Sequence, residues 1–333
     1  MTAIRIGTRG SDLAMWQADF VRQALLNHCP GLEIELVVIT TGGDEGLDKL
    51  DKNKPGADNS VAGSVQNPGK GLFTKEIEDA LLERKIDLAV HSLKDLPTQL
   101  PEGLGISAVM EREDPADAFI GRGVAKISNL PRWACVMTGS PRRAAQLLHI
   151  RPDLKVLPIR GNVPTRLRKF RQSGADGLIL ALAGLKRLGL ADQVTERLLS
   201  DDFLPAPGQG AMAIETRQSG GELSDLCRRL DHLPTRLCVS AERAYLSAMG
   251  GGCRAPIGAW AQFQADGRLV LTGMISSSDG KRLVRDSVES PNCTTPQSAI
   301  ELGHHLAEVI CARGINDILH LSGHQLSPGM EDA

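Results

Sequence analysis

Aromatic residues are scarce in this chain of 333 residues, at 3%, and its seven cysteines are scattered without any Cys-x-x-Cys pair. The net charge at pH 7 is only −2. A nucleic-acid surface needs a basic excess and usually stacking rings, so we expect no nucleic-acid partner. The number and spacing of the cysteines also argue against a metal site and against a disulfide framework. Any positive patch must therefore be local.

Long hydrophobic runs are missing as well. The longest, residues 177–185, is far too short to span a bilayer, and the opening MTAIRIG lacks the charged and apolar regions of a signal peptide. We therefore expect a cytoplasmic protein with no membrane partner. Its hydrophobic fraction of 41% is ordinary for a globular chain, and its length is sufficient for two or three domains.

Strand-like and helix-like patterns alternate between residues 4 and 185. This alternation is typical of doubly wound α/β domains with mostly parallel sheets. The acidic, proline-containing residues 111–117 are expected to cross between two such domains, and Ser11 and Ser140 are predicted to cap helices. The predicted strands span residues 4–6, 32–40, 86–92, 134–140, 156–161 and 177–183.

The pattern changes near residue 233. A helix over SAERAYLSAM precedes antiparallel strands joined at ADGR and SDGK, and a final helix is predicted near 297–313, so we expect a smaller α+β domain. Residues 41–71 are rich in Gly, Asp and Asn and contain few large apolar side chains. We interpret them as an exposed loop, either a lid or an insertion.

Arginines follow several of the predicted strands. Ligands of open α/β sheets bind at the carboxyl ends of the strands, so this placement favours an anion-binding edge. The planar guanidinium pairs with carboxylates through two hydrogen bonds, so several arginines favour a ligand with several carboxylates or phosphates. The residues are Arg9, Arg142, Arg143, Arg160, Arg166 and Arg187.

The segment TGSPRRAAQL carries two of these arginines. Ser140 suits the N-cap and Pro141 the first helical position, which places Arg142 and Arg143 in the first turn. Cations are disfavoured there by about 0.3–1 kcal/mol each, because of the helix dipole. The two arginines are either solvated surface side chains or part of an anion site.

Two further segments carry candidate chemistry. In HSLKDLP, Lys94 and Asp95 follow a predicted strand, so Asp95 is a candidate acid-base residue. A Lys-Asp pair in a loop is more often a surface ion pair. A histidine such as His91 is likewise more often structural than catalytic. In GGGCRAPIG, Cys253 follows three glycines. The glycines either end a helix beside a buried thiol or let a large group approach the sulfur.

These segments occur in the order and approximate spacing of porphobilinogen deaminase, also called hydroxymethylbilane synthase, and the chain resembles this family over nearly its whole length. The segments that carry the resemblance are GTRGSDLAMWQA, GKGLFTKEIEDALL, HSLKDLP, TGSPRRAAQL, RGNVPTRL, AGLKRLG, LPAPGQGAMAIE and GGGCRAPIG. The resemblance implies a monomeric transferase of tetrapyrrole and heme biosynthesis. It would join four porphobilinogen molecules head to tail, release ammonia each time, and free linear 1-hydroxymethylbilane by hydrolysis.

The resemblance also implies a dipyrromethane cofactor, bound by a thioether to Cys253, and Asp95 as the catalytic residue. By matching positions, the cofactor would be held by Arg9, Ser11, Lys94, Ser140, Arg142, Arg143 and Arg187. The substrate would contact Arg9, Arg160, Arg166, Gln209, Phe73 and Lys70.

The family layout implies two domains similar to periplasmic-binding-protein lobes around a cleft, and a third domain that carries the cysteine. The expected boundaries are 1–110 with 211–228 for domain 1, 116–204 for domain 2 and 233–333 for domain 3. Domain 1 would contain a lid loop over residues 42–70, which is longer than is usual in the family.

A non-catalytic, two-lobed polycarboxylate-binding protein is the main alternative, because it would explain the arginine edge equally well. It would not explain Asp95 beside Lys94 together with a glycine-flanked cysteine in a separate domain. A phosphate-handling enzyme is a weaker alternative, since the chain has no P-loop and no Gly-x-Gly-x-x-Gly turn after a strand.

Overall fold

The computed structural model describes residues 3–42, 74–199, 202–250, 256–315 and 318. The chain divides into two compact units. The first consists of Met1–His91, Asp95–Ala108 and Ala213–Leu230, and the second of Ser92–Lys94, Val109–Met212 and Asp231–Ala333. The division into three domains that the family layout implies stays a prediction.

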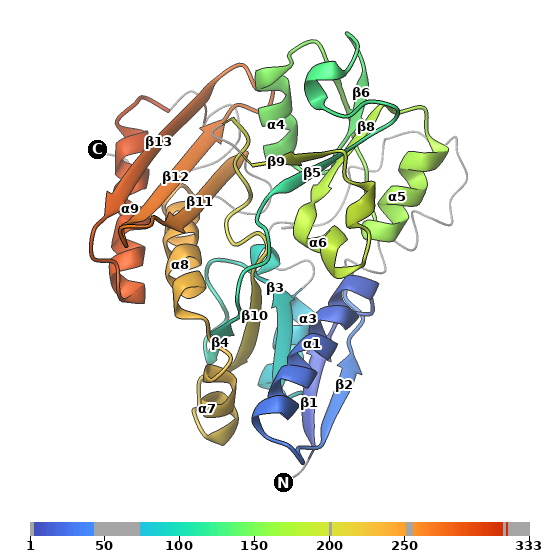
Figure 1. Ribbon diagram of the computed structural model, residues 1–333. Coiled ribbons are helices and arrows are strands. Elements are labelled where there is room, and N and C mark those ends of the chain that lie inside the picture. Colours follow the sequence, from blue (N-terminus) through green and yellow to red (C-terminus); the bar gives the residue numbers. More distant parts are fainter. Residues whose placement is uncertain (1–2, 43–73, 200–201, 251–255, 316–317, 319–333) are drawn as a thin grey trace. The chain divides into compact units, whose positions relative to one another are not determined.

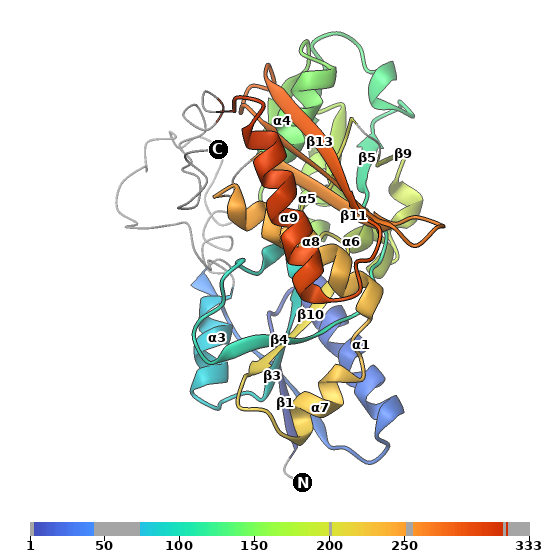
Figure 2. The same cartoon turned by 90° about the vertical axis from the view of Figure 1, so that its left-hand side faces the viewer.

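The first unit is built on a five-stranded sheet in the order β2-β1-β3-β10-β4 (Figure 1). Strand β1 runs parallel to both β2 and β3. Helices α1 (Asp12–His28) and α3 (Lys75–Leu82) lie on opposite faces of this sheet, as Figure 2 shows, and α7 (Glu222–Arg228) follows β10. The strands are β1 (Ile4–Thr8), β2 (Ile34–Val38), β3 (Leu88–Ser92), β4 (Leu104–Val109) and β10 (Met212–Arg217).

A second five-stranded sheet, in the order β7-β6-β8-β5-β9, lies in the second unit. Its parallel strands β6, β7 and β8 have the same second-first-third order as β1, β2 and β3, which agrees with the shared alternation in the sequence. The strands are β5 (Asp117–Gly121), β6 (Cys135–Met137), β7 (Lys155–Leu157), β8 (Gly177–Ala181) and β9 (Glu196–Leu198). The helices are α4 (Pro141–Ile150), α5 (Val163–Gln172) and α6 (Leu182–Arg187), with short 3-10 turns η2 (Ile127–Asn129) and η3 (Ala191–Gln193).

The last part of the chain forms a three-stranded antiparallel sheet with two helices. The predicted turns at ADGR and SDGK connect its strands, and the predicted helices are present. Tyr245, Leu271, Leu306 and Ile310 are fully buried in one apolar core between the sheet and the helices. The elements are α8 (Leu233–Ala248), β11 (Ile257–Phe263), β12 (Leu269–Ser276), β13 (Leu283–Ser290) and α9 (Pro296–Cys311).

The predicted fold class, two α/β sheets and a smaller α+β part, is therefore confirmed. The second sheet is mixed rather than mostly parallel, because β5 runs antiparallel to both β8 and β9. The caps are also confirmed, because the Ser11 hydroxyl accepts from the Ala14 amide and the Ser140 hydroxyl from the Arg143 amide. Residues 111–117 were expected only to cross between two domains. Their last residue, Asp117, is in fact the first residue of strand β5, which runs antiparallel to β8. Within the described part of the chain, no helix is long and apolar enough to cross a membrane.

Candidate active site

The Gln209 side chain connects several of the predicted site residues in the second unit. Its Oε1 atom accepts from Lys94 Nζ at 3.3 Å and from Arg143 Nη2 at 3.4 Å. Its Nε2 atom donates to Asp117 Oδ1 at 2.9 Å and to the Pro115 carbonyl at 2.7 Å. The amide is fully buried, so its position is defined by these contacts on both sides.

Asp117 accepts hydrogen bonds from two arginines in the first turn of α4. Arg142 Nη1 donates to Oδ2 at 2.7 Å, and Arg143 Nε donates to Oδ1 at 2.8 Å. Both guanidiniums are buried, with exposed fractions of 3% and 5%, so the interpretation of solvated surface side chains is wrong. The first turn of α4 tolerates these cations because a buried carboxylate faces them.

The electrostatics of this group follow from burial and from the opposed charges. Burial alone would raise the pKa of Asp117, but the positive charges of Arg142 and Arg143 hold it well below its ordinary value. Burial also lowers the pKa of Arg142, and the Asp117 carboxylate opposes that effect. Two guanidiniums share one carboxylate, so this part of the site carries an excess of positive charge.

Arg187 adds a third guanidinium near the Gln209 turn. Its Nη2 atom donates to the Gly210 carbonyl at 2.7 Å. Burial lowers the pKa of Arg187 to about 10, and the nearby Glu113 carboxylate opposes this shift. Glu113 is itself paired with Lys186 at 2.8 Å, so its charge is largely compensated.

Lys94 and Asp95 lie in a short 3-10 turn, η1 (Leu93–Asp95), directly after β3. The turn is fixed at its start because the Leu93 amide donates to the Ala211 carbonyl at 3.0 Å. Asp95 itself is exposed, whereas Leu93 beside it is fully buried. Asp95 thus follows a strand, as its position in the sequence predicts, while its catalytic role stays a prediction.

The other predicted residues occupy separate places. Arg9 and Ser11 lie between β1 and α1 in the first unit, and both are partly buried. Arg160 is exposed after β7, and the Nε atom of Arg166 donates to the Gly161 carbonyl at 2.7 Å. Their ligand contacts stay predictions. Cys253, Lys70, Phe73 and residues 43–70 of the expected lid loop lie outside the described residues.

Two buried side chains that support the site were not identified from the sequence. Asp117 was assigned to a crossing segment, and Glu242 lies within the helix that was predicted only as a preceding element. One feature of the sequence could have identified Asp117: it directly precedes the apolar run AFI, and a carboxylate is unusual at the start of a buried strand. Its partners, Arg142 and Arg143, lie on α4 and are distant from Asp117 in the sequence, so the ion pairs between them could not be inferred from the sequence.

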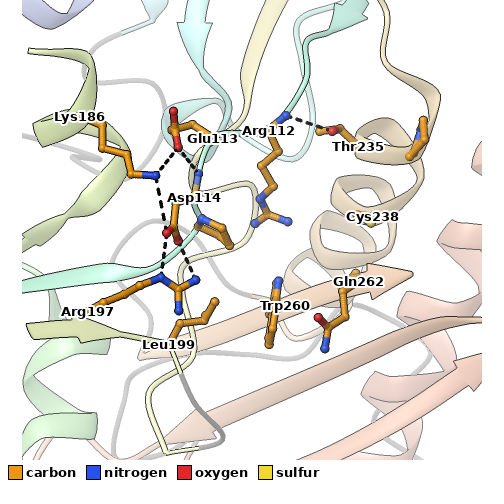
Figure 3. A pocket seen from close by; sticks show the side chains of 13 residues that line it. Arg112, Glu113, Asp114, Lys186, Arg197, Leu199, Thr235, Cys238, Trp260 and Gln262 are labelled. Atoms are coloured by element: carbon orange, nitrogen blue, oxygen red, sulfur yellow. Dashed lines mark hydrogen bonds and ion pairs between the residues drawn. The ribbon is translucent and has the colours of Figure 1, made fainter. Parts of the chain in front are cut away.

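The pocket in Figure 3 lies elsewhere in the second unit, and none of the predicted site residues lines it. Its volume is about 500 Å³, and Trp260, Cys238 and Leu199 contribute to its wall. The charges there are compensated in pairs: Lys186 with Glu113, and Arg197 with Asp114. Arg112, which also lines the pocket, is paired with the buried Glu242. This balance gives the pocket no preference for an anionic ligand.

These observations define a mixed α/β protein with a buried, cation-rich cluster at the ends of its strands and a smaller α+β part. The chain belongs to the porphobilinogen deaminase family. Residues 4–225 match the family model described as porphobilinogen deaminase, dipyromethane cofactor binding domain, and residues 236–312 match porphobilinogen deaminase, C-terminal domain. The family assignment made from the sequence motifs is therefore confirmed.

Individual proteins agree with the family models. The porphobilinogen deaminase of Chloroherpeton thalassium is 44% identical over 317 residues, covering 95% of this chain and 96% of that protein. The porphobilinogen deaminase of Geobacter sulfurreducens is 47% identical over 321 residues, covering 96% and 94%. A solved structure of the methionine-binding protein MetQ, 13% identical, covers 74% of this chain and 93% of its own, with a TM-score of 0.42. That similarity is too low to bear on ligand or function.

Proposed function

We propose that this protein is a hydroxymethylbilane synthase, which condenses four porphobilinogen molecules head to tail. It would be primed by a dipyrromethane attached through Cys253 and would finally release 1-hydroxymethylbilane. Family membership supports the reaction class. The observation that carries the proposal to this chain is the excess of positive charge around Gln209, because each pyrrole of the substrate bears an acetate and a propionate.

The fit between the cluster and a polycarboxylate follows from charge. The four basic groups are Lys94, Arg142, Arg143 and Arg187. Arg142 and Arg143 contact the Asp117 carboxylate, whereas Lys94 contacts Gln209 and Arg187 contacts the Gly210 carbonyl. Guanidinium groups bind carboxylates strongly when both are shielded from water. A polypyrrole carboxylate would therefore be attracted to this cluster, and these residues would hold the cofactor. When bound, the dipyrromethane supplies the pyrrole carbon to which the next unit is joined.

Asp95 would act on the substrate. Loss of ammonia breaks a carbon–nitrogen bond of porphobilinogen and leaves a cation, which then forms a carbon–carbon bond while the accepting pyrrole loses a proton. A fixed carboxylate can hydrogen-bond the pyrrole N–H, stabilise the positive charge and assist the proton transfers. The exposed position of Asp95 after a rigid strand supports this role, because a substrate can reach it.

The intact mass of the denatured protein tests the proposal. The wild type and the Cys253→Ala variant are purified from the same host, with Cys29→Ala as a matched control at another cysteine. We expect a mass excess of two linked pyrrole units on the wild type and on the control, and none on Cys253→Ala. A wild type that stays unmodified after incubation with porphobilinogen would contradict the proposal. Consumption of porphobilinogen and formation of the linear product are measured in parallel.

A further inference from the structure

A buried pair of titratable groups joins β3 to β10 in the first unit. His91 is on β3 and Glu215 is on the neighbouring β10, with exposed side-chain fractions of 5% and 0%. The Nε2 atom of His91 lies 2.9 Å from Oε2 of Glu215. This is ion-pair distance, although neither atom has a well-aligned hydrogen bond within the described part of the chain. Both oxygens of Glu215 are thus buried, and the His91 imidazole is the partner that lies at ion-pair distance from one of them.

The layer between α3 and the sheet is mostly apolar, although Glu78 on α3 is also buried there. Ile77, Ala80 and Ala89 belong to the buried cluster between α3 and the sheet. A buried ion pair in such a layer contributes little stability, because the loss of hydration offsets the attraction, and apolar residues of similar size often serve as well. Stability of the fold therefore does not account for an imidazole and a carboxylate at these positions.

The place of His91 in the chain suggests what the pair does. His91 is the second-last residue of β3, and the turn that carries Lys94 and Asp95 starts two residues later. The contact between His91 and Glu215 therefore links the end of β3 to the neighbouring β10, next to the start of this turn. A fixed strand end gives the following turn one orientation.

We propose that His91 is a positioning residue for the reaction: its ion pair with Glu215 fixes the end of β3 and so orients Asp95 toward the substrate. This inference rests on the proposed function of the site. It assigns His91 no direct contact with the substrate. Its effect passes through the backbone of Ser92, Leu93 and Lys94.

The groups that face the pair define its charge environment. Glu78 on α3 interacts electrostatically with both members of the pair and is itself only 6% exposed, whereas Asp79 beside it is exposed. Burial raises the pKa of Glu78, and the negative charge of Glu215 adds to this effect, while Thr74 and His91 oppose it. Removal of the His91 side chain would therefore leave two buried carboxyl groups, Glu78 and Glu215, without the imidazole beside them.

The test compares three variants with the wild type. His91→Gln removes the imidazole, and His91→Gln with Glu215→Gln removes both members of the pair. Asp87→Asn is the matched control, because Asp87 lies just before β3 and pairs with Arg5 at 2.9 Å at the opposite end of the same strand. For each protein, kcat, KM for porphobilinogen and the melting temperature are measured.

We expect His91→Gln to lower both the melting temperature and kcat, with kcat falling about tenfold to hundredfold and KM staying within about twofold, since misplaced reacting groups slow the chemical step. The double variant should regain the melting temperature but not kcat. Asp87→Asn should lower the melting temperature and keep kcat. A double variant with the kcat of the wild type would overturn the proposal, as would an equal loss of kcat in Asp87→Asn.

If neither glutamine variant folds, Glu215→Asp replaces them, because it keeps the charge and only withdraws the carboxylate from His91. Its kcat should fall several-fold with KM unchanged, and an unchanged kcat would contradict the positioning role.

Absence of turnover in the wild type would instead refute the proposed function. Amide hydrogen exchange of Leu93–Asp95 then decides the positioning role: faster exchange in Glu215→Asp than in Asp87→Asn supports it, and equal exchange overturns it.

Discussion

Arg112 donates to both carboxylate oxygens of Glu242, with Nη1–Oε1 at 2.6 Å and Nη2–Oε2 at 3.1 Å. Glu242 is fully buried and also accepts from the amides of Gly208 and Ala261. Arg112 further donates from Nε to the Gln209 carbonyl at 2.8 Å. One ion pair therefore connects α8 and β11 with the turn that positions Gln209, so the candidate site depends on contacts far from the cations that form it.

Glu242→Gln should lower the free energy of unfolding by about 3–5 kcal/mol, because it leaves the Arg112 charge buried without its partner. Thermal and urea unfolding would measure this. Arg197→Gln serves as the control, since Arg197 is half exposed in its pair with Asp114 and should change stability by less than about 1 kcal/mol. Similar losses of unfolding free energy in the two variants would show that the buried Arg112–Glu242 pair matters no more for stability than the exposed pair.

Asp117→Asn should destabilise the protein by a similar amount, about 3–5 kcal/mol near neutral pH, because two buried guanidiniums would then lack their carboxylate. Loading with the cofactor should fall as well, since the arginines would no longer be fixed. Intact mass and urea unfolding are the measurements. A stable and fully loaded Asp117→Asn variant would exclude the organising role of this carboxylate.

The Asp117 pair also predicts how stability depends on pH. The folded-state pKa of Asp117 lies far below the ordinary value of 3.8, so the unfolded chain binds its proton first as the pH falls. The stabilisation by Asp117 is complete above about pH 5 and is lost as the pH falls through and below the unfolded value. Unfolding free energy should therefore rise with pH in this range for the wild type, and the slope should be smaller for Asp117→Asn. Equal slopes in the two proteins would contradict the prediction.

Asp95→Asn should reduce kcat by about 10²–10⁴, the range typical for loss of an acid-base group, without changing the melting temperature, because Asp95 is exposed. Steady-state turnover of porphobilinogen gives kcat. Glu102→Gln, another exposed carboxyl in the first unit, is the control and should leave kcat unchanged. Full activity of Asp95→Asn would exclude the catalytic role of Asp95.

Gly280→Ala should disturb the turn between β12 and β13. Gly280 has a φ of +73°, and an added Cβ would lie 2.5 Å from the Ala145 carbonyl oxygen on α4. Gly267, with a φ of +87°, has nothing within 4 Å, so Gly267→Ala carries only the backbone strain. Gly280→Ala should therefore lower the unfolding free energy by about 1–3 kcal/mol more than Gly267→Ala. Equal effects in urea unfolding would mean that α4 moves aside at no cost.

Local sequence patterns were sufficient for most of the secondary structure. Short apolar segments predicted β1 and β3, and the serine caps predicted where α1 and α4 begin. The turns at ADGR and SDGK were also correct. Strand β5 was missed because its short apolar run follows an acidic, proline-containing segment, and its pairing with β8 is made by residues distant in the sequence.

By itself the sequence determined which chemical groups this protein carries and the family to which it belongs, since motifs in a constant order are a local property of the chain. It placed Arg142 and Arg143 in the first turn of a helix and Asp95 after a strand. Only the tertiary structure decided that Asp117 lies between the two arginines, that Gln209 contacts Lys94, and that Glu215 faces His91. These partners come from strands and turns far apart in the chain, and burial removes the water that would otherwise satisfy each charge separately, so their pairing is a property of the packed fold.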